Sequence, residues 1–154
     1  MSKKAKIIWS IIVIVVLVLV GGYFYGTNAV AHKVPGHVYE YTSVSGNNKV
    51  YMSFSKDSDQ AIVTSQKSDA VKSAQSKSNF DDIYQKEMKN GCWQYLAKGS
   101  HLTLTKTQGG KTSRWQYNNC FALGNRIHSR SFTYQIVNAG QGVDRKATNF
   151  VRVK

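Results

Sequence analysis

The chain has 154 residues, two cysteines and a formal net charge of +13, from 21 Lys and Arg against 8 Asp and Glu. Because an apolar segment takes up about the first thirty residues, the roughly 120 that remain suffice for one domain and exclude a second. The cysteines lack C-x-x-C spacing and the four histidines are scattered, so we expect no metal site and no cofactor.

The N-terminal segment 7–25 is uncharged, and twelve of its nineteen residues are Ile, Leu or Val. As a helix it would extend about 28 Å, close to the hydrocarbon thickness of a bilayer. We therefore predict a transmembrane anchor. Tyr23 and Tyr25 fit an aromatic belt at the outer interface.

The flanking charges predict the orientation of this anchor. Lys3, Lys4 and Lys6 precede the apolar segment, and positive charge tends to remain inside. Residues 1–6 should form a cytoplasmic basic tip, with the rest of the chain outside the cell membrane. The alternative is a secreted protein cleaved near Ala31, because 29–31 match the A-x-A pattern of a signal peptidase site. An uncleaved anchor is favoured, since a cleavage site normally follows the apolar core closely.

Residues 26–36, which include the single proline Pro35, are expected to form a stalk before an extracellular β domain at 37–154. Alternation with period two predicts strands over 37–44, 49–55 and 60–66. The turn 45–48, Ser-Gly-Asn-Asn, supplies residues that tolerate positive φ in a hairpin. The domain should therefore begin with an antiparallel meander.

A helical insertion is predicted around 67–90. Apolar residues recur at helical spacing, and Asn90-Gly91 marks the end of the helix; the periodic positions are Phe80, Ile83, Tyr84, Glu87 and Met88. The preceding segment 67–77 is rich in Ser and Lys and predicts a weak first helix, with a loop as the alternative.

Five more strands are predicted over 93–98, 101–106, 111–118, 126–138 and 147–153. Glycine-marked turns are short, so neighbours should pair antiparallel. The expected fold class is all-β, meaning β-rich with a helical insertion: an antiparallel barrel or curved sheet of about eight strands, plus one N-terminal transmembrane helix.

Four features of the C-terminal half carry a resemblance to a known architecture: Gly99, Leu102-Thr103-Leu104, Trp115, and the closing Phe150-Val151-Arg152-Val153. In these residues the chain resembles the small lipocalin-like domains of single-span or secreted bacterial cell-surface proteins. The resemblance implies a small antiparallel β-barrel. The glycine-x-tryptophan motif that opens a lipocalin is missing, because Gly36 is followed by His37 and Val38.

Charge is distributed unevenly along the domain. Residues 32–88 contain seven basic and seven acidic side chains, whereas 89–154 contain eleven basic side chains and the single acid Asp144. If these cations share one side, they predict a polyanion-binding surface for anionic cell-wall polymers or lipid headgroups, with nucleic acid less favoured. Its residues would be Lys98, Lys106, Lys111, Arg114, Arg126, Arg130, Arg145, Lys146 and Arg152. The alternative interpretation is an ordinary solvated basic surface.

Two other functions are compatible with the sequence. A protein–protein interaction module of the immunity or phage-exclusion type would use the helix face of Phe80, Ile83 and Tyr84. A sortase-like transpeptidase would use His101, Cys120 and Arg126 or Arg130, which occur in that order, although 118–119 lack the Thr-Leu-x-Thr that leads into the sortase cysteine.

Two side-chain questions stay open in the sequence. A disulfide between Cys92 and Cys120 would suit an oxidising compartment, but a plain meander places them at opposite ends of the sheet. The aromatic residues Trp115, Tyr117, Phe132 and Tyr134 belong either to the core or to a surface that stacks on sugars or bases.

Overall fold

The computed structural model describes residues 3–42, 48–136, 140–144 and 146–153. The N-terminal half contains α1 (Lys3–Asn28), α2 (Val30–Lys33), β1 (Val38–Thr42), β2 (Lys49–Phe54), β3 (Gln60–Thr64), α3 (Lys67–Ser73), α4 (Lys77–Glu87) and a 3-10 turn (Met88–Asn90). The C-terminal half contains β4 (Cys92–Lys98), β5 (His101–Gln108), β6 (Lys111–Asn118), β7 (Phe121–Leu123), β8 (Arg126–Ser129), β9 (Ser131–Ile136), β10 (Gly140–Asp144) and β11 (Thr148–Arg152).

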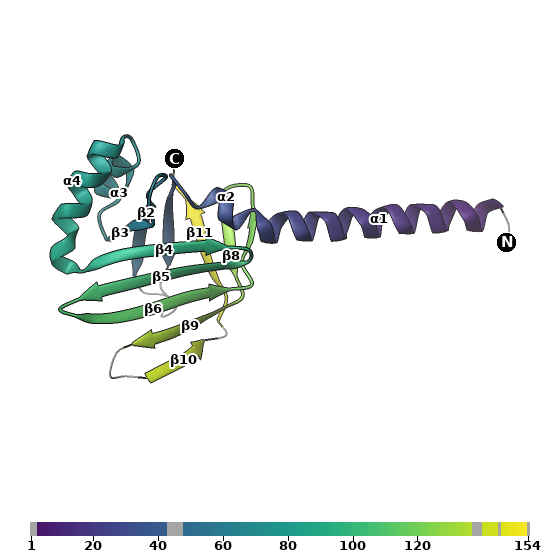
Figure 1. Cartoon of the computed structure of the whole chain (residues 1–154). Coiled ribbons are helices and arrows are strands. Elements are labelled where there is room, and N and C mark those ends of the chain that lie inside the picture. The colour runs from purple at the N-terminus through teal and green to yellow at the C-terminus, as the bar shows by residue number, and fades with distance from the viewer. Residues whose placement is uncertain (1–2, 43–47, 137–139, 145, 154) are drawn as a thin grey trace.

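The strands form one antiparallel sheet that curls into a half-barrel (Figure 1). Among the described residues it has 11 strands in the order β10-β9-β6-β5-β4-β3-β2-β1-β11-β8-β7. Strands β1 to β6 lie side by side in sequence order, and β3 and β4 are neighbours although the helical insertion connects them. The expected β-rich fold with a helical insertion at 67–90 is confirmed, whereas the expected number of about eight strands is too low.

Three differences account for the extra strands. The segment 126–138 is not one strand, because it breaks at Arg130 into β8, which pairs with β11 and β7, and β9, which pairs with β6 and β10. Strands β7 and β10 were not predicted. The turn 45–48, expected to close the first hairpin, lies outside the described residues apart from Asn48.

The core lies on the concave face of the sheet. Alternating positions point inward, so aromatic rings from distant strands meet there. Tyr41 stacks on Phe150 with ring centroids 4.9 Å apart, and Tyr117 meets Phe150 edge-on at 4.8 Å. Tyr117 is buried, which assigns it to the core, whereas Trp115, Phe132 and Tyr134 are only half-buried.

The helices α3 and α4 cover the convex face of β2 and β3, on the side of the domain away from α1 (Figure 1). Ile62 of β3 is buried against Phe80, Ile83 and Tyr84 of α4. The buried Oγ atoms of Ser53 and Ser73 are 2.7 Å apart and join β2 to α3. Helix α4 begins at Ser76, whose Oγ accepts a hydrogen bond from the Asn79 backbone N–H.

Candidate functional site

The long apolar helix α1 runs directly into the domain. It is long and apolar enough to cross a membrane, and its apolar side chains lie exposed. Only its last turns touch the sheet: the Tyr23 ring stacks on Phe121 of β7 at 6.3 Å, and a Cβ added at Gly26 would overlap that ring. The edge strand β7 is therefore covered by α1.

Helix α2 continues this contact into the core. Ala29, Val30 and Val34 are buried in the same cluster as the aromatic rings. The Tyr39 hydroxyl donates to the Lys33 carbonyl at 2.7 Å, and the Lys33 ammonium donates to the Gly124 carbonyl at 3.2 Å. Residues 26–36, expected to form a stalk, are thus helical as far as Lys33 and packed against the domain.

The loops at the end of the sheet from which α1 leaves are tied together by backbone hydrogen bonds (Figure 1). Cys120, next to Phe121, donates its N–H to the Ser100 carbonyl at 2.7 Å, and Arg130 donates to the Asn118 carbonyl at 3.2 Å. In the register of β8 and β11, Ser129 lies opposite Thr148, which brings the start of β11 to the same end.

We call the exposed side chains of these loops the anchor-side rim: Lys98, His101, Asn119, Arg130 and Lys146. The segments that form it, 98–101, 118–121, 129–131 and 146–148, contain no Asp or Glu. The charged residues of these segments are thus cationic, and the one acid of this half of the chain, Asp144, lies opposite Phe132 at the end of β10, two residues before Lys146.

The other residues predicted to bind a polyanion lie elsewhere. Lys106 and Lys111 are at the opposite end of β5 and β6, where the Lys106 Nζ lies 5.7 Å from the Trp93 ring centroid. Arg114 is on the outer face of β6. Arg126 and Arg152 flank the β7–β8 turn: Arg152 donates its N–H to the Asn125 carbonyl at 2.7 Å, and the neighbouring Gly124 carbonyl accepts from Lys33 of α2. Arg145 lies outside the described residues. Of the predicted set, Lys98, Arg130 and Lys146 lie on the rim segments, whereas Lys106 and Lys111 lie at the other end of β5 and β6.

The residues of the sortase-like hypothesis do not assemble into a nucleophile and base. Cys120 is fully buried in the core, its thiol donates to the Tyr117 carbonyl at 3.4 Å, and burial raises its pKa to about 11. His101 points away from the core, with its Nδ1 3.2 Å from the Asn118 Oδ1. A buried protonated thiol is a poor nucleophile.

The two cysteines are free, so the possible disulfide is not formed. Cys92 begins β4 and lies opposite Thr107, whereas Cys120 contacts Ser100 beyond the other end of β4. They occupy opposite ends of the sheet, as a plain meander requires.

The helix face proposed for a protein partner is covered. Phe80, Ile83 and Tyr84 are each less than 10% exposed because they pack on Ile62, and the Tyr84 hydroxyl donates to the Trp93 carbonyl at 3.4 Å. A partner protein would have to bind other residues of α4.

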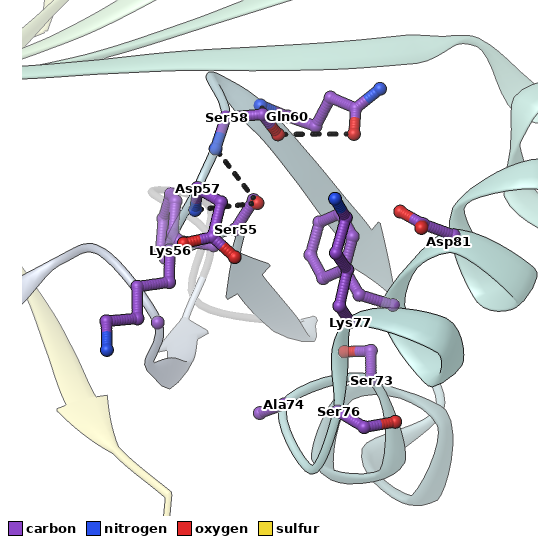
Figure 2. A pocket seen from close by; sticks show the side chains of 13 residues that line it. Ser55, Lys56, Asp57, Ser58, Gln60, Ser73, Ala74, Ser76, Lys77 and Asp81 are labelled. Carbon is purple, nitrogen blue, oxygen red and sulfur yellow. Dashed lines mark hydrogen bonds between the residues drawn. The ribbon is translucent and has the colours of Figure 1, made fainter.

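A groove that the sequence did not reveal lies between the β2–β3 turn and the helices (Figure 2). Its cavity of about 390 Å³ is lined by hydroxyls and by charges of both signs: Ser55, Ser58, Ser73, Ser76, Lys56, Asp57, Lys77 and Asp81. The hydroxyls already serve the fold, since the Ser55 Oγ accepts from the Asp57 and Ser58 N–H groups. The balanced charges give this groove no preference for anions.

A neighbouring cavity of about 490 Å³ shares Gly36 and Ala74 with this groove and reaches Arg152. His37 lines it, and burial together with the positive charge of Arg152 lowers the His37 pKa. Burial and the Arg152 charge both disfavour the protonated imidazole. Anion binding in this cavity is therefore not expected to strengthen as the pH falls.

The chain matches no known protein family, no curated protein and no solved structure. Among the described residues, the anchor-side rim combines exposed cations with a position at the end of the sheet from which α1 leaves. Sequence reasoning identified three of its cations but not their grouping, because that grouping depends on how the loops meet in the folded sheet.

Proposed function

We propose that this is a single-span membrane protein whose β domain lies outside the cell membrane and binds anionic lipid headgroups through the anchor-side rim. The length and exposure of α1 support the span. The lysines at 3, 4 and 6 support a cytoplasmic N-terminus.

Burial at the junction supports an uncleaved anchor over a secreted form. Cleavage after Ala31 would separate Ala29 and Val30 from the domain, yet Val30 is 0% exposed and Ala29 only 6%. Removing buried aliphatic groups costs about 2–5 kcal/mol for a large side chain, so the domain would lose part of its core with the anchor.

The single observation that carries the proposal is the docking of α1 on β7. Tyr23 belongs to the segment expected at the outer interface, and it stacks on Phe121, one residue beyond the rim contact of Cys120. With Tyr23 at the outer interface, as proposed, Lys98, Arg130 and Lys146 would lie near the lipid headgroups. Each cation near an anionic surface contributes about 1 kcal/mol, an attraction that salt screens.

Lipid dependence of domain stability tests the proposal, because a ligand that binds only the folded state raises the unfolding temperature. The full-length protein would be placed in nanodiscs of phosphatidylcholine, with or without one third phosphatidylglycerol, and unfolding followed by near-ultraviolet circular dichroism. We expect the anionic lipid to raise the midpoint by about 5 °C at low salt and by much less at high salt.

The variant Lys98→Gln/Arg130→Gln/Lys146→Gln should lose this rise. The matched control Lys56→Gln/Lys72→Gln/Lys77→Gln removes three exposed charges on the helical side and should keep it. Inorganic polyphosphate added to neutral nanodiscs examines the other anion source. If only polyphosphate raises the unfolding midpoint, the ligand of the rim is an anionic wall polymer rather than a lipid headgroup. If neither anion raises the midpoint, the rim does not bind polyanions.

A further inference from the structure

The outer face of β4, β5, β6 and β9 is an unusually uniform polar surface. Its central cross-strand row is Leu96, Thr103, Gln116 and Thr133. The next row is Gln94, Thr105, Arg114 and Gln135. No Asp or Glu occurs between Glu87 and Asp144, so β4, β5, β6 and β9 contain no acid. Among the described side chains, Asp59 lies at one corner of this face, where it accepts a hydrogen bond from Gln94 at 2.9 Å.

Side chains on this face are already organised by hydrogen bonds across three strands. The Asn118 Oδ1 accepts from the Gln116 Nε2 at 2.9 Å and lies 3.2 Å from the His101 Nδ1. The Asn118 Nδ2 donates to the Thr133 Oγ1 at 3.0 Å. Side-chain networks of this kind are a minor share of protein hydrogen bonds, and they fix the direction in which remaining donors and acceptors point.

A shallow hollow of about 490 Å³ adjoins the network at the end of the sheet nearest α1. It is lined by Leu96, Lys98, His101, Thr103 and Gln116. Leu96 is 60% exposed and gives the hollow one apolar contact. The hollow therefore offers hydroxyl, amide, cationic and aliphatic groups together, and no carboxylate.

We propose that this outer face binds an anionic glycan chain. Thr hydroxyls and Gln amides both donate and accept, as sugar hydroxyls do. Lys98 and Arg114 would pair with carboxylate or phosphate substituents, and Leu96 would contact the C–H face of a sugar ring. Strands β4 to β6 run along the direction of α1 (Figure 1), so eight residues of β5 extend the face about 26 Å outward from the rim.

This site takes a different ligand from the lipid-binding rim, although the two share Lys98 and His101. Threonine is common on exposed strand faces because it favours strands, so an ordinary solvated face would also be rich in it. Such a face would bind a sugar polymer no more tightly than another polymer of equal charge. Selectivity for sugar is therefore the property to measure.

The experiment uses the full-length protein in phosphatidylcholine nanodiscs and three soluble probes: alginate, a polymer of uronic acids; polyglutamate, which has carboxylates without sugar; and dextran, which has sugar without charge. Calorimetric titration should show alginate binding more tightly than either of the others. Equal affinity for alginate and polyglutamate, or no affinity for alginate, overturns the proposal.

Two variants assign the binding to this face. Gln116→Ala/Thr133→Val should weaken alginate binding about tenfold, because hydrogen bonds to a charged or polar ligand are lost. Its affinity for polyglutamate should be unchanged. Thr103→Glu, at a half-exposed position, places an acid in the hollow and should weaken alginate further. The matched control Gln75→Ala/Ser78→Ala, on exposed residues of the helical side, should bind as the wild type does.

The same variants separate this proposal from the proposed function. The unfolding midpoint of Gln116→Ala/Thr133→Val should still rise with phosphatidylglycerol, since Arg130 and Lys146 are untouched. An unchanged alginate affinity in both outer-face variants would exclude this face, whatever the response to lipid.

Discussion

Cys120 illustrates how burial sets the chemistry of one side chain. Its thiol is fully buried, and burial raises its pKa from 9.0 to about 11. The thiol ionises at a lower pH in the unfolded chain than in the folded chain. The protonated form of Cys120 therefore stabilises the folded state relative to the unfolded state. This contribution is complete below pH 9 and is lost as the pH rises toward 11.

We therefore predict an alkaline loss of stability that depends on this residue. Between pH 9 and pH 11 the wild type should lose about 2 kcal/mol more unfolding free energy than Cys120→Ala, measured by urea unfolding in detergent micelles. Cys92→Ala controls for the loss of a thiol elsewhere. If the unfolding free energies of wild type and Cys120→Ala changed in parallel with pH, this thiol would have the same pKa in the folded and unfolded states.

The inward position of Cys120 was not predictable from alternation. Tyr117 points inward, so alternation would send residue 119 inward and residue 120 outward. Asn119 has a φ of +50°, a left-handed conformation that Asn tolerates, and this bend returns Cys120 to the core. For the same reason His101 and Cys120, which the sequence places in catalytic order, lie on opposite faces of the sheet.

At the scale of elements, the junction of α1 with β7 depends on one small residue. Gly26 lies where any Cβ would overlap the Phe121 ring, whereas Gly22 has nothing within 4 Å. In a helix, Gly→Ala ordinarily raises the unfolding free energy by up to about 1 kcal/mol. The change in unfolding free energy should therefore have opposite signs at Gly26 and Gly22.

We predict that Gly26→Ala destabilises the full-length protein by about 1–3 kcal/mol through overpacking, while Gly22→Ala is neutral or stabilising. Urea unfolding in micelles measures both. In the background of Phe121→Ala the penalty at Gly26 should disappear, because the clashing ring is gone. A penalty that persists without the ring would contradict the contact.

Elements with strong local signals were predictable, and those defined by tertiary pairing were not. Strands β1 to β6 have alternating side chains and turns marked by Gly99 or Gly109-Gly110, and α4 has both helical spacing and a capping serine. Strand β7 has only three residues, and β10 contains two glycines, so neither shows a periodic pattern. The break at Arg130 exists because β8 and β9 pair with different partners.

At the scale of the whole molecule, the sequence predicts how much positive charge the second half has but not where it lies. Lys98 lies at the β4–β5 turn and Lys111 at the β5–β6 turn, so antiparallel pairing places them at opposite ends of β5. Only the folded register shows that Lys98, Arg130 and Lys146 lie at the same end of the sheet. The outer polar face was likewise hidden, because its rows combine residues from four separate strands.

If α1 spans the bilayer as proposed, its docking on β7 predicts one orientation of the domain toward the membrane. With a paramagnetic headgroup in the nanodisc lipid, amide signals of Ser100 and Arg130 at the rim should be strongly attenuated. Signals of Gly109 and Gly110, in the turn at the opposite end of β5, should be preserved. Equal attenuation at both ends would indicate that the domain reorients freely about the helix.

Because α1 packs directly on β7, a change in the tilt of α1 would also change the orientation of the domain. Transmembrane helices tilt by about 20° on average, and they change tilt when hydrocarbon thickness changes. Because Phe121 holds α1 against β7, such a tilt would rotate the sheet as well, moving a point about 26 Å along β5 sideways by roughly 9 Å. Bilayer thickness would then set the angle at which the polar face meets the polymers around it.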